Sequence, residues 1–482
     1  MHVVTSPAFK QNATAALANA GLQKALANSG PSFIARRAAA VAGLPEFEQL
    51  RDIGRDIKNH TLTHLDFYLE AYEAKLAAAG GQLHWCATAD DACAVVLAIC
   101  QKAGARSVTK GKSMISEEIG VNEHLERHGI TPVETDLGEY IIQLRHELPS
   151  HIIAPAFHLN REDWEAQFRK SHTDLPPDRV FAERRDILTE ARNTLREKFL
   201  AADVGITGAN FLIAETGSSV IVTNEGNGDL TQTLPRIHIV LASIEKIVPT
   251  LEDATSLLRL LARSATGQDF SVYTTFSTGA RRQDDLDGPE EYHVVLVDNG
   301  RSAMLGTEFQ EMLRCIRCAA CMNHCPVYGA VGGHAYGWVY PGPMGSVLTP
   351  ALVGVDKAGL LPNASTFCGK CESVCPVKIP LPKLMRHWRE REFERHLTPS
   401  AVRTNLALWA WVAKRPALYR LATRVAARAL GWLGRKRGRF ARLPFAGGWT
   451  GGRDLPAPEG DTFFARYAKA QRAGQKSAGQ KS

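Results

Sequence analysis

Apolar and polar positions alternate with two different periods between residues 61 and 300, and this predicts a layered α/β domain. Apolar residues recur with helical spacing over 91–103, 113–128, 181–201 and 251–265. Short runs rich in β-branched residues predict strands at 107–109, 131–135, 151–156, 210–214, 219–223, 237–243, 272–276 and 293–297. Because the two kinds of segment alternate, we expect a largely parallel sheet with helices packed on it.

The segments on either side have other patterns and divide the chain into four parts. Residues 1–60 are polar and helical, with Pro31 and Gly43 as interruptions. Residues 301–395 are dominated by cysteine, glycine and proline, and helical spacing is confined to 307–313 and 381–391. Residues 396–482 are basic and rich in tryptophan. We therefore expect an N-terminal helical segment (1–60), the α/β domain (61–300), a helical cysteine-rich domain (301–395) and a C-terminal extension (396–482).

Charge is distributed unevenly along the 482 residues, whose net charge is +7. Residues 395–453 contain thirteen Lys or Arg and no Asp or Glu. Without these thirteen, the rest of the chain has 44 basic and 50 acidic residues and therefore a net charge of −6. Residues 417–433 are amphipathic, with Arg420, Arg424 and Arg428 on one face. This pattern is typical of a helix that docks on an anionic membrane surface or an acidic partner; packing on the chain's own acidic remainder is the alternative.

Hydropathy and cysteine usage give the expected compartment. No run approaches the roughly 18 apolar residues of a membrane span, and no signal peptide is visible. The ten cysteines are too few for a disulfide scaffold, and clustered cysteines in a reducing compartment more often bind metal. We expect a cytoplasmic protein that contacts the inner face of the membrane peripherally. The basic extension carries no recognised nucleic-acid-binding motif, so we expect no nucleic-acid partner.

Seven cysteines form two motifs with ligand spacing. The first motif, C-x2-C-x2-C-x3-C-P, consists of Cys315, Cys318, Cys321, Cys325 and the proline that follows. The second, C-x2-C-x3-C-P, consists of Cys368, Cys371, Cys375 and its proline. These spacings are typical of two-cluster ferredoxins, in which the cysteine before proline binds the other cluster. Zinc is the alternative, but its sites use four ligands, usually from two C-x2-C pairs.

The crossed pattern assigns four ligands to the first cluster and three to the second. Cluster 1, a [4Fe-4S] cluster, takes Cys315, Cys318, Cys321 and Cys375, and cluster 2 takes Cys325, Cys368 and Cys371. The position three before Cys368 is Ser365. Cluster 2 is therefore either a [4Fe-4S] cluster with a non-cysteine fourth ligand or a [3Fe-4S] cluster.

Charged side chains flank these ligands, and three further cysteines lie apart from them. Arg314, Arg317, Lys370 and Lys378 would favour a reduced cluster, unless they are ordinary solvated surface. Cys86, Cys93 and Cys100 are spaced by seven residues, so Cys93 and Cys100 share one face of the helix predicted at 91–103, and we interpret all three as buried apolar side chains.

Two places in the α/β domain have residues suited to binding or catalysis. Lys110, Lys112 and Ser113 follow a predicted strand and begin a predicted helix, where backbone N–H groups and two ammonium groups suit an anion. An ordinary capped turn is the alternative. Glu215 lies near glycine-rich turns and could act as a base or nucleophile, although a tight turn between strands explains the same residues.

The two cysteine motifs and their flanks resemble the lactate utilization protein B family, the iron–sulfur subunit of a bacterial L-lactate oxidation complex. The resemblance is carried by Glu308 to Tyr328 and Ala364 to Pro380, by Lys110-Gly-Lys-Ser-Met114 with Glu117, by Gly208 to Gly217 and by Trp409 to Trp449. It implies an N-terminal lactate-utilization domain with an isomerase- or CoA-transferase-like layered sheet, then a helical two-cluster ferredoxin domain. The family shares the four-plus-three cysteine count, so Ser365 is no departure from it.

The resemblance also implies a function and partners. The chain would be a non-catalytic subunit that relays electrons during oxidation of L-lactate to pyruvate, with a cysteine-rich companion and a smaller subunit built on the same lactate-utilization domain. The rival hypothesis is an isomerase- or CoA-transferase-like enzyme that uses Glu215 and has regulatory clusters.

Overall fold

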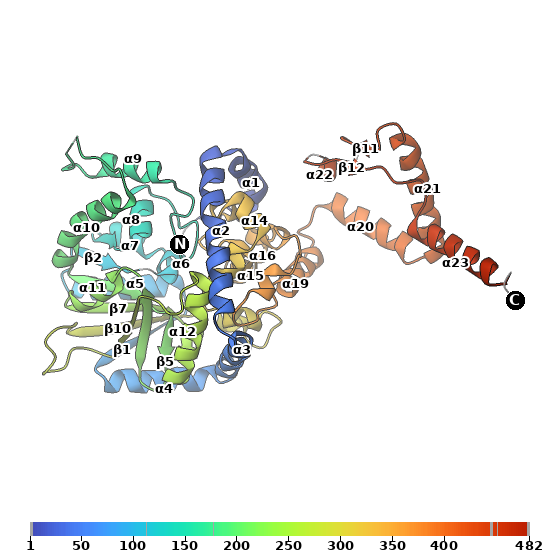
Figure 1. Ribbon diagram of the computed structural model, residues 1–482. Coiled ribbons are helices and arrows are strands. Elements are labelled where there is room, and N and C mark those ends of the chain that lie inside the picture. Colours follow the sequence, from blue (N-terminus) through green and yellow to red (C-terminus); the bar gives the residue numbers. More distant parts are fainter. Residues whose placement is uncertain (1–2, 112, 177, 444–446, 451, 480–482) are drawn as a thin grey trace. The chain divides into compact units, whose positions relative to one another are not determined.

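A six-stranded parallel sheet forms the centre of the α/β part of the molecule (Figure 1). Its strand order is β1-β10-β7-β4-β2-β3, and every neighbouring pair is parallel. In that order the strands are Gly81–Cys86, Glu291–Val297, Ile237–Ser243, Val204–Gly208, Ser107–Lys110 and Thr131–Glu134. A second sheet of four strands has the order β8-β5-β6-β9, with Ile247–Val248, Phe211–Ile213, Ser218–Thr223 and Tyr273–Ser277.

Helices cover both faces of the parallel sheet because its central strands are apolar on both sides. On β7, Ile239 packs into one hydrophobic cluster with α5 (Ala89–Lys102), while its neighbour Val240 packs into another with α4 (Leu65–Ala78). Successive strand residues point to opposite faces, so the two clusters lie on opposite sides of the sheet. The expected fold class, an α/β layered domain with a parallel sheet, is thus confirmed.

Among the described residues, the α/β domain has seven further α-helices. They are α6 (Met114–Ile119), α7 (Val121–Glu126), α8 (Leu137–Leu144), α9 (Arg161–Ser171), α10 (Arg184–Ala201), α11 (Asn227–Thr233) and α12 (Leu251–Ala265). Short helices make up the cysteine-rich part: α13 (Ala320–Asn323), α14 (Pro326–Val331), α15 (Gly342–Val353), α16 (Val355–Ala358), α17 (Leu360–Asn363), α18 (Lys370–Ser373) and the longer α19 (Leu381–Glu394).

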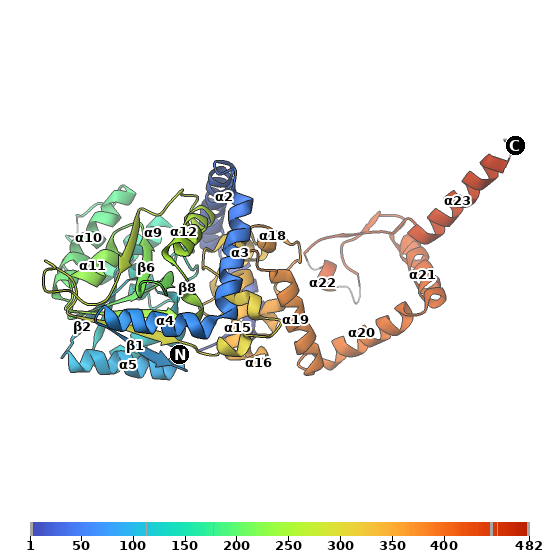
Figure 2. The same ribbon diagram turned by 90° about the horizontal axis from the view of Figure 1, so that it is seen from below.

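Three N-terminal helices join the sheet domain to the cysteine-rich helices. They are α1 (Phe9–Ala18), α2 (Ala20–Ala42) and α3 (Phe47–Thr63). Figures 1 and 2 both show α2 and α3 between the strands and the cysteine-rich helices. One hydrophobic cluster includes Phe47 of α3, Leu257 of α12 and Met322 of α13, so the three parts share a core.

The computed structural model describes residues 3–111, 113–176, 178–443, 447–450 and 452–479. The chain divides into two compact units, Met1–Glu392 and Phe393–Ser482. The second unit contains α20 (Ser400–Ala413), α21 (Pro416–Gly434), α22 (Gly447–Thr450), α23 (Phe463–Gly479) and a hairpin of β11 (Arg439–Phe440) and β12 (Leu455–Pro456). None of the helices described is both long and apolar enough to cross a bilayer.

Three sequence-based element predictions are wrong. Residues 151–156 form bends rather than a strand, because the His151 ring accepts the N–H groups of Ile153 and Ala154 and Pro155 cannot donate. The helix predicted at 113–128 is two helices, because Gly120 adopts a left-handed conformation with φ of 72°. The helix predicted at 307–313 is only a 3-10 turn at Gln310–Arg314.

Candidate metal centres

A short loop and helix α13 hold three of the seven predicted cysteine ligands. Arg317 and Ala319 have φ of 61°, so the chain turns tightly between Cys315, Cys318 and Cys321. Cys318 and Cys321 are buried and Cys315 is half-buried. Cys375, more than fifty residues later in the chain, follows α18 and is also buried. Its sulfur accepts the N–H of Ile379 at 3.3 Å.

The electrostatic environment of these cysteines shows which thiols are neighbours. Burial, with a contribution from Cys315, raises the pKa of Cys375 to about 11. Burial also raises the pKa of Cys318, and the nearby thiols Cys375 and Cys315 add to this increase. For Cys321 the pKa is raised by burial and then by Cys315, Cys318 and Cys375. We call Cys315, Cys318, Cys321 and Cys375 the first thiol group.

The other three cysteines line one small cavity with Ser365 and Thr366. Burial raises the pKa of Cys371 to about 12, and the next cause is Cys325. Cys368 is exposed, and the backbone N–H of Lys370 is the main cause of its lowered pKa. We call Cys325, Cys368 and Cys371 the second thiol group. The two groups adjoin, because Cys371 is among the charges that raise the pKa of Cys321.

The donor set fits iron–sulfur clusters better than single metal ions. Thiolates on one zinc ion approach within about 3.8 Å of each other, since Zn–S bonds are about 2.3 Å long. Among the described residues, no three His, Cys, Asp or Glu side chains are placed to share one metal ion. A cluster instead gives each cysteine its own iron, so ligands spread over two adjoining groups suit it. Buried thiols with raised pKa values also need nearby iron to become thiolates.

Three buried cations lie around Cys315. Lys58 on α3, Lys246 after β7 and Arg317 each have this thiol among the groups that raise their pKa. Burial nevertheless lowers the pKa of Lys58 to about 8 and that of Lys246 to about 7. The Lys58 ammonium donates to the backbone carbonyl oxygens of Glu245 and Ile247. Two other cations expected beside the ligands form ion pairs instead: Arg314 pairs with Glu311, and Lys378 pairs with Asp52.

A buried ionic network connects this loop to the sheet domain. The Arg301 guanidinium, with no exposed surface, contacts Glu118 of α6 at 2.6 Å and Glu245 at 3.0 Å. Arg317 contacts the other oxygen of Glu245 at 3.1 Å. The Tyr340 hydroxyl donates to Glu118 at 2.6 Å. Sequence reasoning missed Glu118, Glu245 and Arg301, because single charged residues in apolar surroundings give no recognisable spacing.

The predicted anion site has a different arrangement from the one expected. The Lys110 ammonium is buried between Glu117 and Glu134, at 2.6 Å from each carboxylate. Burial alone would lower the pKa of Lys110, but these two carboxylates raise it. Lys110 is therefore engaged by acidic side chains, and Lys112 lies outside the described residues. Ser113 accepts the N–H of Ser116 at the start of α6.

The contacts of the other candidate residues indicate structural roles. The exposed Glu215 accepts the N–H of Leu251, which supports the start of α12. Cys86, Cys93 and Cys100 are buried as expected, with pKa values that burial raises to about 11, 11 and 12. Their inclusion in the hydrophobic cluster beside α5 confirms the packing interpretation.

Comparison with known proteins matches three family models in chain order. They are a LUD domain at residues 69–297, a 4Fe-4S dicluster domain at 311–379 and a lactate utilisation protein B C-terminal domain at 383–472. Lactate utilization protein B of Macrococcus caseolyticus is 42% identical over 459 residues, which are 94% of this chain and 95% of that protein. The Bacillus subtilis protein of the same name is 41% identical over 472 residues, 96% of this chain and 97% of the relative.

Two further proteins are similar to the chain. An uncharacterized electron transport protein of Escherichia coli is 40% identical over 453 residues, which cover 93% of this chain and 94% of the relative. A crystal structure of a duf162 family protein from Deinococcus radiodurans matches 48% of this chain and 98% of its own, with 14% identity and a TM-score of 0.27.

The buried network generates a stability prediction. Glu118→Gln leaves Arg301 with less compensating charge, and we expect the free energy of unfolding to fall by about 3 kcal/mol. Glu126→Gln, on the exposed surface of the adjacent helix α7, is the matched control and should change it little. Thermal unfolding of the full chain at pH 7 measures both, and equal stability of the two variants would contradict the assigned role of Glu118.

The same pair predicts a pH dependence. Although burial opposes it, Arg301 lowers the pKa of Glu118 below the ordinary value of 4.5. The stabilisation is therefore present above pH 4.5 and is lost as the pH falls through the lower folded-state pKa. The difference in stability between wild type and Glu118→Gln should shrink over that acidic range.

Proposed function

Because the chain belongs to the lactate utilization protein B family, we propose that it relays electrons through two iron–sulfur clusters during oxidation of L-lactate to pyruvate. In this proposal it is a non-catalytic subunit that works with a cysteine-rich companion and a smaller subunit with a lactate-utilization domain. The observation that carries the proposal is the adjacency of two thiol groups within a 4Fe-4S dicluster domain. Clusters held side by side store and pass single electrons.

Each thiol group supplies the ligands of one cluster in this proposal. Cys315, Cys318, Cys321 and Cys375 hold cluster 1, a [4Fe-4S] cluster, and Cys325, Cys368 and Cys371 hold cluster 2. The neighbours that raise each thiol's pKa support this division. Thiolate-bound clusters become more negative on reduction, so Lys58, Lys246 and Arg317 would stabilise the reduced form of cluster 1.

The geometry gives less support to the alternative enzyme. A catalytic Glu215 would have to face a ligand cavity, but its carboxylate supports the first turn of α12 from an exposed position. The side chain therefore has a sufficient structural explanation, and the relay remains the function that the site supports best.

Iron content and paired cysteine variants test the relay. Protein purified anaerobically should hold about seven or eight irons with acid-labile sulfide. Cys318→Ser should remove the EPR signal of cluster 1, because it deletes a thiolate ligand. Cys93→Ser, a buried thiol outside both groups, should keep both signals. Stoichiometric zinc without sulfide would disprove the central proposal, and loss of a cluster only in Cys93→Ser would disprove the ligand assignment.

The fourth position of cluster 2 can be tested at Ser365. This side chain lines the same cavity as the second thiol group, and its hydroxyl accepts the N–H of Phe367. If cluster 2 lacks one iron, the oxidised protein shows a [3Fe-4S] EPR signal, and Ser365→Cys should abolish it by supplying the missing thiolate. If the wild type has no such signal and contains eight irons, cluster 2 is a [4Fe-4S] cluster with a non-cysteine ligand. Ser373→Cys, an exposed serine on α18, is the control.

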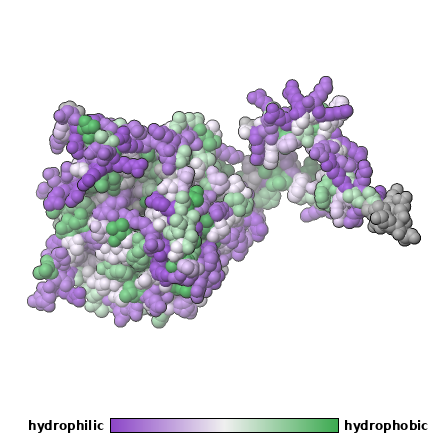
Figure 3. Space-filling view, in the orientation of Figure 1, coloured by the Kyte–Doolittle hydropathy of each residue, from purple (hydrophilic) through white to green (hydrophobic). Residues whose placement is uncertain are grey.

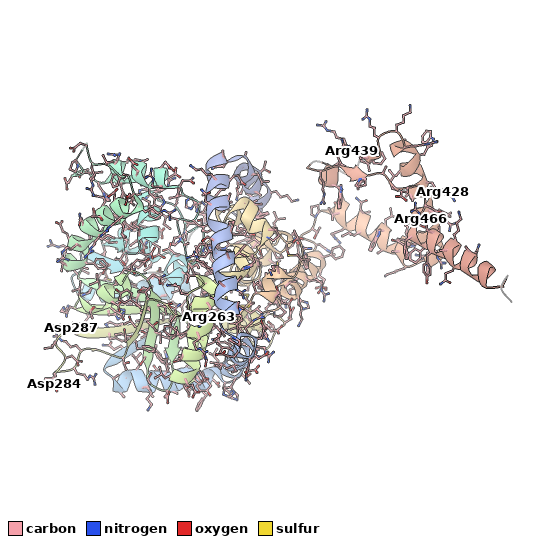
Figure 4. All side chains as sticks on the ribbon, viewed as in Figure 1. Arg263, Asp284, Asp287, Arg428, Arg439 and Arg466 are labelled. Carbon is pink, nitrogen blue, oxygen red and sulfur yellow. The ribbon has the colours of Figure 1, made fainter. Side chains whose placement is uncertain are left out.

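The second unit has the surface of a docking element. Helix α20 buries none of its residues, and Trp409, Trp411 and Trp432 are 61%, 52% and 74% exposed. Figure 3 shows hydrophobic and hydrophilic side chains side by side on this unit, and Figure 4 shows Arg428, Arg439 and Arg466 on it. Exposed tryptophan beside arginine suits the headgroup region of a membrane with anionic lipids. We therefore propose that this unit holds the protein at the cytoplasmic face of the membrane.

Charge reversal on α21 tests this docking. Changing Arg420, Arg424 and Arg428 together to Glu should abolish binding to anionic vesicles, and the triple Ala variant should weaken it less. Each basic residue contributes about 1 kcal/mol near such a surface, and the effect is screened beyond a Debye length of about 8 Å. Binding of the wild type should therefore fall as salt rises.

The matched control reverses three exposed arginines on helix α10, Arg185, Arg192 and Arg196. It should bind vesicles as the wild type does. Vesicle binding that does not depend on salt would contradict docking through α21. So would an equal loss of binding in the charge-reversal variants of α21 and α10. Failure to bind vesicles combined with salt-sensitive binding to an acidic companion subunit would transfer the role from membrane to protein docking.

A further inference from the structure

A cavity of about 520 Å³ lies in the α/β domain, and the electron relay makes no use of it. Its walls include Gly208 at the end of β4, Ser243 at the end of β7 and Asp136 after β3. In open parallel sheets, ligands bind outside the carboxyl ends of the strands. The volume is also within the range of small-molecule sites, about 300–1,000 Å³.

Lys246 lines this cavity and has no polar partner of its own there. The residue is only 9% exposed. Within the described part of the chain, its ammonium has no hydrogen bond and no ion pair at salt-bridge distance. The nearest carboxylate in the sequence, Glu245, is already bridged by Arg301 and Arg317. The side chain is mostly buried and its ammonium has no partner among the described residues, so this position favours binding of an anion.

Arg317 provides a second cationic side chain on the cavity wall. One terminal nitrogen contacts Glu245, while the other, Nη1, is buried and has no hydrogen-bond partner among the residues described. The guanidinium lies over the Tyr340 ring at 4.9 Å, and both side chains line the cavity. Lys246 and Arg317 thus place two cationic side chains on the wall of the same cavity.

The acidic residues of the cavity wall limit the charge of the ligand. Asp136 accepts the N–H groups of Gly138 and Glu139, so it is engaged at the start of α8. Glu225 is exposed. The two cations and two carboxylates of the lining cancel in formal charge, which favours a ligand with a single negative charge over a phosphate dianion. Phe33, Ile152, Phe157 and Leu261 supply an apolar wall for an organic group.

We propose that this cavity binds a small organic monocarboxylate, with its carboxylate against Lys246 and Arg317. The site is independent of the relay function, because neither its walls nor its cations require a bound cluster. If both proposals hold, the ligand lies beside the loop of cluster 1, since Arg317 is between Cys315 and Cys318 in the sequence. The alternative role for Lys246 is to balance the negative charge of cluster 1 only.

Equilibrium binding to the full-length, cluster-loaded protein tests the site. Isothermal titration under anaerobic conditions would use L-lactate, pyruvate and phenylpyruvate as probes, with inorganic phosphate for comparison. We expect at least one carboxylate to bind with one-to-one stoichiometry and more tightly than phosphate. Lys246→Met should weaken that binding about 10- to 100-fold, the range for loss of a hydrogen bond to a charged group.

Two more variants separate the cavity from general effects. Ala154→Phe should also weaken binding, because Ala154 lines the cavity and the larger ring fills it without changing any charge. Lys198→Met removes an exposed ammonium from α10 and should leave binding unchanged. Cluster absorbance and EPR of each variant establish that the protein is folded and loaded.

Three results would overturn the proposal. They are no carboxylate binding by the wild type, equal binding by Lys246→Met, and phosphate binding as tight as that of the carboxylates. A Lys246→Met protein that binds normally but has a lowered cluster 1 potential would assign Lys246 to charge balance alone. Because iron content and EPR signals do not depend on the added acid, a failure of the cavity proposal is distinguishable from a failure of the relay.

Discussion

The buried guanidinium of Arg301 is the interaction on which the arrangement of the first unit depends. It follows the last strand of the parallel sheet and contacts Glu118 from α6 and Glu245 from the turn after β7. Glu245 in turn holds Arg317, inside the first cysteine motif. Separating a fully buried cation from its carboxylates is strongly destabilising, so these ion pairs favour packing of the cysteine loop against the carboxyl end of the sheet. The position of the first thiol group is thereby set by the sheet domain.

The N-terminal helices hold the second half of the ligand set in place. Arg51 of α3 donates twice to the carbonyl oxygen of Cys375, at 3.0 and 2.7 Å, and Arg37 of α2 donates to that of Val374 at 3.0 Å. These bonds fix the backbone of the second motif from a segment more than three hundred residues earlier. A crossed ligand set requires such support, because Cys375 must lie beside the distant Cys318. What looked like a weakly patterned polar prefix is therefore part of the scaffold of the thiol groups.

The sequence predicted periodic features well and isolated contacts poorly. The strand at 237–243 and the helix at 251–265 have the predicted bounds, because uninterrupted apolar patterns of the right period specify them. The seven cysteines were found by spacing, which reflects the geometry of a cluster and not of the fold. The segment 151–156 was misjudged because a single histidine ring satisfies its backbone. Glu118, Glu245 and Arg301 were missed because they are brought together only by the tertiary structure.

Three buried lysines show how differently the chain compensates a charge. Lys110 has two carboxylates at 2.6 Å, and these raise its pKa despite burial. Lys58 has only backbone carbonyl oxygens and the nearby Cys315, and its pKa falls to about 8. Lys246 also has Cys315 nearby but, among the described residues, no carboxylate or carbonyl oxygen at hydrogen-bond distance; it lines a cavity, and burial lowers its pKa to about 7. The structure thus completes the charge balance internally for Lys110. Lys58 and Lys246 both lie near Cys315, where a bound cluster would supply negative charge, and in our proposal an anion in the cavity adds to it for Lys246.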